Sequence, residues 1–94
     1  MLYTFYCSDK AEAVGVRVAH REAHLAFLDE LGNRLFVAGP LLSEDGSTMV
    51  GSLIIVDCEH MAAAHALATR DPYAKAGLFS SVAIKPWRKV RPKS

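Results

Sequence analysis

The sequence predicts an α+β fold of the ferredoxin-like type, in which a four-stranded antiparallel sheet carries two helices on one face. Two observations support this prediction. Strand-like runs alternate with two segments of helical periodicity in the order β-α-β-β-α-β. Turn residues join the two middle strands, and no linker, repeat or low-complexity segment interrupts the order. A chain of 94 residues has the length of one domain, and we expect residues 1–94 to form it.

The first two predicted elements differ in their hydrophobic period. Residues 2–7 are mostly β-branched or aromatic, which predicts a strand that stops at Ser8 and Asp9. Between residues 16 and 31 the apolar residues recur at helical spacing, and Gly32 favours the end of that helix. One face of the predicted helix contains His20, His24, Phe27, Leu28 and Leu31.

The middle of the chain predicts a hairpin. Residues 35–38 form the second strand, and Gly-Pro at 39–40 should end it. The turn-forming residues 43–47 precede a return strand over residues 49–58. Gly51 interrupts this strand early, which is typical of a bulge or of a close approach by backbone or ligand.

The last third of the chain predicts a helix followed by a strand. Asp57 is a candidate N-cap for a helix that runs to about Thr69, and its many alanines favour helix and allow close packing on a sheet. Asp71 and the following proline should end the helix. Residues 79–87 form the last strand.

The hydrophobic content of 51% is high for so short a chain, which buries only about 60–65% of the surface that its unfolded form exposes. Two helices on one face of the sheet leave the other face uncovered. Because a small domain has little interior, we expect the apolar surplus to lie in a subunit interface between two sheets packed face to face. The sequence therefore predicts a homodimer.

The charge and the cysteines exclude several functional classes. A formal net charge of +1 gives no broad basic surface for nucleic acid. No apolar run approaches the ~20 residues of a membrane span and no signal peptide is evident, so we expect a cytoplasmic protein that binds no membrane. Cys7 and Cys58 lack a CxxC spacing and should pack as small hydrophobic residues. A solvated terminal tail explains the one basic cluster: Lys85, Arg88, Lys89, Arg91 and Lys93.

His24 is the most informative polar position. Its neighbours on the helix, Phe27, Leu28 and Leu31, place it near the middle of the packed face. A buried imidazole without a partner costs about 1–3 kcal/mol, so we expect a carboxylate or a backbone carbonyl beside it. Taken alone, a single core histidine fits a structural role better than a catalytic one.

Asp71 is the second candidate position. It lies in the sequence Arg-Asp-Pro-Tyr at residues 70–73. An Asp-Pro pair is a common turn, so the local sequence by itself favours helix termination as the role of this aspartate.

Six short segments are informative together: Arg-Glu-Ala-His-Leu at 21–25, Ala-Gly-Pro at 38–40, Gly-Ser at 51–52, Asp-Pro-Tyr at 71–73, Ala-Gly at 76–77 and Lys-Pro-Trp at 85–87. In order and approximate spacing these segments resemble the YciI-like (YCII-related) family. Together they extend from the first helix to the last strand. The resemblance implies a dimeric α/β barrel of ferredoxin-like subunits with a His–Asp pair in a pocket. The histidine of the Arg-x-x-His-Leu segment is His24, and the aspartate of the Asp-Pro-Tyr segment is Asp71.

The resemblance also implies a kind of chemistry. One member of the family dehydrochlorinates a chlorinated hydroxyquinol, and relatives by fold include isomerases of ring lactones. A carboxylate on one ring nitrogen of histidine fixes the tautomer and raises the basicity of the other nitrogen, which suits general acid–base catalysis. We therefore expect cofactor-free proton transfer or elimination on a small cyclic or aromatic molecule. Candidates to orient that substrate, for each of which an ordinary packing role is the alternative, are Ser52, Tyr73, Arg21 and Tyr6.

Two other interpretations remain open. His20 and His24 are spaced i, i+4, which can chelate a transition metal, but no further ligand is apparent and Arg21 would repel a cation. We therefore expect no metal. Ferredoxin-like dimers also serve as ligand-binding or accessory modules, in which His24 and Asp71 would anchor a ligand or fix the helix on the sheet. A catalytic pair should open into a cavity, whereas a structural pair should be sealed.

Overall fold

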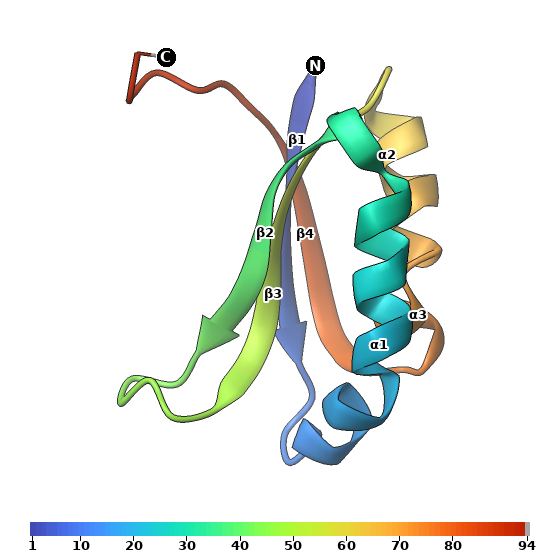
Figure 1. Cartoon of the computed structure of the whole chain (residues 1–94), viewed down its shortest axis with the longest axis vertical. Coiled ribbons are helices and arrows are strands. Elements are labelled where there is room, and N and C mark those ends of the chain that lie inside the picture. Colours follow the sequence, from blue (N-terminus) through green and yellow to red (C-terminus); the bar gives the residue numbers. More distant parts are fainter. Residues whose placement is uncertain (94) are drawn as a thin grey trace.

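The computed structural model describes residues 1–93 and has the predicted ferredoxin-like fold. Four strands form one antiparallel sheet in the order β2-β3-β1-β4. The helices lie together on one face of this sheet, and no helix or strand of the described residues covers the other face (Figure 1). The elements are β1 (Leu2–Asp9), α1 (Val14–Glu30), a 3-10 turn (Gly32–Arg34), β2 (Leu35–Leu42), β3 (Met49–Asp57), α2 (Met61–Thr69), α3 (Pro72–Lys75) and β4 (Phe79–Trp87).

The core lies between the sheet and the helices. Alternate residues of the central strand β1, namely Tyr3, Phe5 and Cys7, are buried and face the helices. They pack with Ile54 and Val56 of β3 and with the buried residues of α1 and α2. The two cysteines are free and buried, as expected.

The open face of the sheet is largely apolar. Side chains that alternate with the core residues point to this face, as for Tyr6 on β1 and Val37 on β2. The helices are a separate matter: none that the structure describes is long and apolar enough to span a membrane. Other large apolar residues on or at the edge of this face include Leu2, Phe36, Leu41, Leu53, Ile55 and Trp87.

Two strands are longer than the sequence indicated. β1 extends beyond Ser8, because Ser8 and Asp9 still pair with β4. The prediction that residues 39–40 end the second strand is wrong, because β2 continues to Leu42 and Pro40 pairs with Ser52. β2 is an edge strand, where the missing N–H of a proline can face away from the sheet.

The predicted N-cap of α2 is also wrong. Asp57 is the last residue of β3, and its carboxylate accepts a hydrogen bond from the N-terminal ammonium of Met1 at 2.8 Å. The N-cap is His60, whose Nδ1 accepts from the backbone N–H of Ala63 at 3.0 Å. Since histidine is an uncommon cap, the sequence pointed to the nearest aspartate instead.

The glycine in β3 does mark a close approach of backbone. A Cβ at Gly51 would collide with the carbonyl oxygen of Cys7 and lie 2.8 Å from Cδ1 of Leu41. The pairing of β2 with β3 also shifts register between Leu41 and Leu42, beside this glycine. The close contact lies near the start of β3, where Gly51 pairs with Ser8 of β1 and precedes the buried Ser52.

The buried face of α1 differs from the prediction at two positions. His20 is exposed, whereas Arg17 is buried together with His24 and Leu28. At about 100° per residue, Arg17 lies within about 20° of both His24 and Leu28 around the helix axis, and His20 lies about 60° from Arg17. The stripe that faces the sheet therefore includes an arginine, which the periodicity of apolar residues did not reveal.

Candidate functional site

His24 and Asp71 are in contact. His24, on α1, is 7% exposed, and its Nδ1 lies 2.9 Å from Oδ1 of Asp71. Because an ionised carboxylate can only accept, we assign the proton to Nδ1, which leaves Nε2 of the neutral ring as an acceptor. The expected carboxylate partner of the buried imidazole is thus the aspartate of the Asp-Pro-Tyr segment.

Asp71 has a local role as well. It is the N-cap of α3, and its Oδ1 accepts from the backbone N–H of Tyr73 at 2.9 Å. The sequence predicted the break before Pro72 but not the short helix that begins there. The second carboxylate oxygen, Oδ2, is buried and has no partner among the described residues.

Tyr73 connects His24 to a buried arginine. Its ring stacks on the imidazole of His24, with centroids 4.0 Å apart and planes 15° apart. The guanidinium carbon of Arg17 lies 4.5 Å from the centroid of the same ring. Arg17 and His24 are seven residues apart on α1, about 10.5 Å along the axis, so the tyrosine ring fits between them.

Arg17 is held on its other side by a carboxylate. Its Nε and Nη2 each donate to Asp9 at 2.9 Å in a bidentate pair, and Nη2 also donates to Oγ of Ser52 at 3.0 Å. Burial alone would lower the pKa of Arg17, but the hydrogen bonds and charge of Asp9 outweigh it and raise that pKa above its ordinary value. The arginine is therefore a fixed, permanently charged group.

These side chains border a pocket of about 220 Å³ between α1 and the β2–β3 hairpin. Its polar lining consists of Arg17, Arg21, His24, Ser52 and Tyr73. Such a volume suits a molecule of one ring. The rest of the lining is mainly apolar and comprises Leu25, Leu28, Ala38, Gly39, Pro40 and Met49. We call this the His24 pocket.

The second ring nitrogen of His24 is within reach of solvent. Among residues 1–93, the buried side-chain oxygen and nitrogen atoms without a partner are Oγ1 of Thr4 and Oδ2 of Asp71. Nε2 of His24 forms no hydrogen bond with the described residues and is not one of these buried atoms. The imidazole thus has one nitrogen fixed by Asp71 and one that is open to a ligand.

The structure brings most of the predicted site residues together. Ser52, Tyr73 and Arg21 line the His24 pocket. Tyr6 does not; it is 52% exposed and alternates with the buried Phe5 and Cys7 along β1, which places it on the open face of the sheet. The sequence interpretation missed Arg17 and Asp9, although Arg17 lies seven residues, about two helical turns, before His24 on the same stripe.

Cys7 lies near the site but is not a nucleophile. Burial raises the pKa of its thiol to about 12, and the negative charge of Asp71 adds to this effect while Arg17 opposes it. Since the thiolate is the reactive form, the Cys7 side chain stays inert at neutral pH. The part of the chain that the structure describes also holds no group of three His, Cys, Asp or Glu side chains that could bind a metal.

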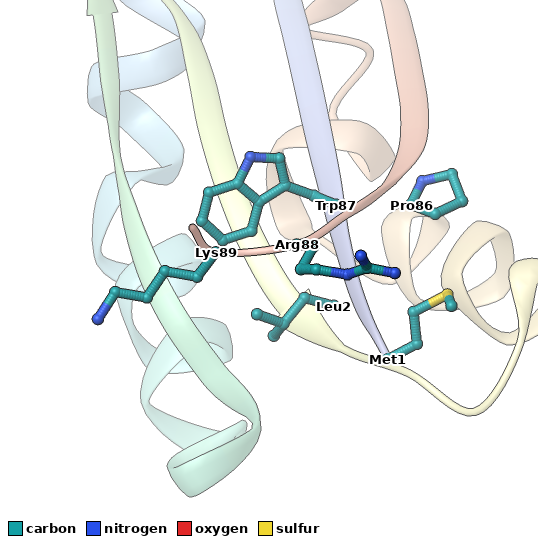
Figure 2. Close-up of a pocket in the computed structure, with 6 residues that line it drawn as sticks. All are labelled: Met1, Leu2, Pro86, Trp87, Arg88 and Lys89. Carbon is teal, nitrogen blue, oxygen red and sulfur yellow. The ribbon is translucent and has the colours of Figure 1, made fainter. Parts of the chain in front are cut away.

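A larger hollow of about 440 Å³ lies elsewhere, where β1 begins and β4 ends (Figure 2). Trp87 and Pro86 extend from opposite sides of the β4 ribbon there (Figure 2). Leu2, which lines this hollow, is five residues from Cys7 along β1, roughly 17 Å at the usual rise of a strand. The hollow is therefore remote from His24 and Asp71, and no carboxylate or histidine lines it.

Comparison with known proteins identifies the family. The model of the YCII-related domain matches residues 1–88. The chain belongs to the YCII-related family. The protein YciI of Escherichia coli O6:H1 is 40% identical over 97 aligned positions, which cover 96% of this chain and 99% of that protein. An uncharacterised protein of Haemophilus influenzae is 37% identical with the same coverage.

A solved structure within the same fold comes from an enzyme. The 5-chloro-2-hydroxyhydroquinone dehydrochlorinase TftG of Burkholderia phenoliruptrix superimposes with a TM-score of 0.87 and is 33% identical, with 97% of each chain covered. That structure is a complex with 2,5-dihydroxybenzoquinone. This YCII-related chain therefore shares its fold with a protein that binds a small, oxygenated ring.

Proposed function

We propose that this YCII-related protein is an enzyme that moves a proton on a small cyclic or aromatic molecule, with His24 as the general acid–base residue. The observation that carries this proposal is the geometry of His24. Asp71 holds one ring nitrogen at 2.9 Å, while the ring lines a pocket and its other nitrogen is unbonded. A sealed structural pair would have no such opening. The likeness to a dehydrochlorinase supports a ring as substrate.

The chemistry follows from the unbonded nitrogen. Neutral His24 takes a proton from an O–H or C–H group at Nε2, which leaves an anion on the substrate and an imidazolium that Asp71 stabilises. In an isomerisation, the imidazolium returns the proton to another atom of the substrate. In an elimination, the electron pair of the anion forms a new π bond and a halide leaves with its bonding pair. Either reaction requires only an acid–base side chain.

Tyr73 and Arg21 support this role. Burial raises the pKa of Tyr73, and the nearby cations Arg17 and Arg21 oppose the effect without cancelling it, so the side chain stays a neutral phenol at physiological pH. Tyr73 therefore orients the imidazole by stacking rather than acting as a base. Arg21 is exposed, lines the pocket and forms no ion pair within residues 1–93, which leaves its charge for a substrate.

The experiment replaces His24 by glutamine. The amide of Gln can still donate to Asp71 but cannot transfer a proton. We expect His24→Gln to lower the turnover of chlorinated hydroquinones by about 10²–10⁴-fold, measured as chloride release and as exchange of ring protons in D₂O. His65→Gln, at an exposed position on α2, is the matched control and should leave turnover unchanged.

Ordinary turnover by the His24→Gln variant would reject the proposal. Binding of 2,5-dihydroxybenzoquinone with no turnover of any ring substrate by the wild type would instead favour a non-catalytic ligand-binding module.

We further propose that two chains pair through the open faces of their sheets, as in a dimeric α/β barrel. Exposed apolar side chains gather on this face, and an apolar sheet face needs a cover. Tyr6 would then belong to the interface. Val37→Glu should convert a dimer to a monomer in light scattering, because it buries a charge in the interface. Val18→Glu, on the exposed face of α1, should leave the dimer intact; a dimeric Val37→Glu would refute this arrangement.

We also infer a cytoplasmic location. Cys7 and Cys58 are free thiols, which suits a reducing compartment.

A further inference from the structure

Among the described residues, the hydroxyl group of Ser52 accepts a hydrogen bond but donates none. It lies on β3, is 2% exposed and lines the His24 pocket. Its Oγ accepts from Nη2 of Arg17 at 3.0 Å, and the hydroxyl proton has no acceptor among residues 1–93. A serine hydroxyl both donates and accepts, and its proton can rotate toward a new partner. The free proton is thus available to a ligand in the pocket.

Arg17 makes this hydroxyl a stronger donor. The guanidinium is 2% exposed and is fixed by the two bonds to Asp9 and by the ring of Tyr73. An N–H of a charged group that donates to a hydroxyl polarises its O–H bond, since hydrogen bonds in a chain strengthen one another. The buried arginine itself also lines the pocket.

We propose that Ser52 and Arg17 form an oxyanion subsite for a phenolate or enolate oxygen of a single-ring ligand. Both groups donate and neither is a base. This complements His24, because removal of a proton from a hydroxylated ring leaves negative charge on oxygen. The assignment rests on the proposed function for the origin of that anion, but a preformed phenolate binds to the subsite without any reaction.

The charges around the pocket fit one negative oxygen. Asp9 and Arg17 neutralise each other as a bidentate pair. Asp71 is negative and is paired with Nδ1 of His24. Arg21 adds a positive charge at the pocket wall. A ligand with one anionic oxygen therefore meets the hydroxyl of Ser52 and the cation of Arg17, with the charge of Arg21 nearby, whereas Asp71 does not line the pocket.

The probe for this subsite is 4-nitrophenol, because its phenolate absorbs at longer wavelength than its phenol. At a pH where both forms of the free dye are present, we expect the wild type to bind mainly the phenolate. Ser52→Ala should lower the ratio of bound phenolate to bound phenol by about 10- to 100-fold, the usual effect of a hydrogen bond to a charged group. Ser52→Thr keeps a hydroxyl and should restore the preference.

Matched variants separate this inference from the proposed function. Ser81→Ala, at an exposed position on β4, should leave the ratio unchanged. In His24→Gln the Ser52-dependent preference should persist, because it requires no proton transfer. If Ser52→Ala does not fold by circular dichroism, Ser52→Cys provides a weaker donor of similar shape and should give a smaller loss.

A wild-type ratio in both Ser52→Ala and Ser52→Cys would overturn the subsite, as would a failure of the wild type to prefer phenolate. A Ser52-dependent preference without turnover of any ring substrate would reject the proposed catalysis and leave the subsite intact.

Discussion

Replacing Arg17 by methionine is expected to lower the free energy of unfolding by about 3–5 kcal/mol, because the carboxylate of Asp9 would remain buried without its partner. Methionine keeps most of the apolar volume of the side chain, so the lost charge dominates the effect. Urea denaturation followed by circular dichroism measures the change. Since a small domain has only about 5–15 kcal/mol of stability, this single substitution removes a large share of it.

Two further variants test the cause of this loss. Arg34→Met removes an arginine that donates to a backbone carbonyl at the surface, and it should change the stability by less than about 1 kcal/mol. Asp9→Leu combined with Arg17→Met removes both buried charges, and it should recover much of the stability of the wild type. A single Arg17→Met variant as stable as Arg34→Met would show that the buried pair contributes nothing.

Gly51→Ala is expected to destabilise the protein by about 1–3 kcal/mol, the usual effect of overpacking a tight site. The added methyl group would collide with the backbone carbonyl of Cys7, which cannot move without separating β1 from β3. In a domain of this size such a change corresponds to a fall of roughly 4–20 °C in the melting temperature, measured by thermal unfolding.

The control for this variant is Gly15→Ala. Nothing lies within 4 Å of a Cβ at Gly15, which is in the first turn of α1, and alanine favours helix. We expect its melting temperature to equal or exceed that of the wild type. If Gly51→Ala melted at the same temperature as Gly15→Ala, the close approach at β3 would not limit the packing of the sheet.

The order of elements could be predicted because each one has a distinct hydrophobic period. Their ends could not, since they depend on tertiary contacts. The second strand continues through Pro40 because β2 is an edge strand, and edge position is not visible in the local sequence. Asp57 has the chemistry of a cap, but the N-terminal ammonium of Met1 occupies its carboxylate and His60 caps α2 instead.

The candidate site was only partly predictable for a related reason. The position of His24 on the apolar stripe required a partner, and the family resemblance pointed to Asp71. The burial of Arg17 could not be predicted, because an arginine in a helix is normally exposed unless it is paired. Its partner Asp9 lies at the end of a strand, and the sequence does not show that the loop between them places the two side chains together.

Oδ1 of Asp71 accepts two hydrogen bonds, and this limits how the protein can be engineered. Oδ1 of Asp71 accepts both from the imidazole of His24 and from the backbone N–H that begins α3. The orientation of the imidazole therefore depends on the position of α3, a four-residue helix of which Tyr73 is the residue that lines the pocket. Redesign of residues 74–76, or an insertion before β4, would shift α3 and with it Asp71. The imidazole of His24 would then rotate even though no residue of the pocket had been replaced. A library that seeks new substrates should keep that turn fixed and vary the apolar wall instead.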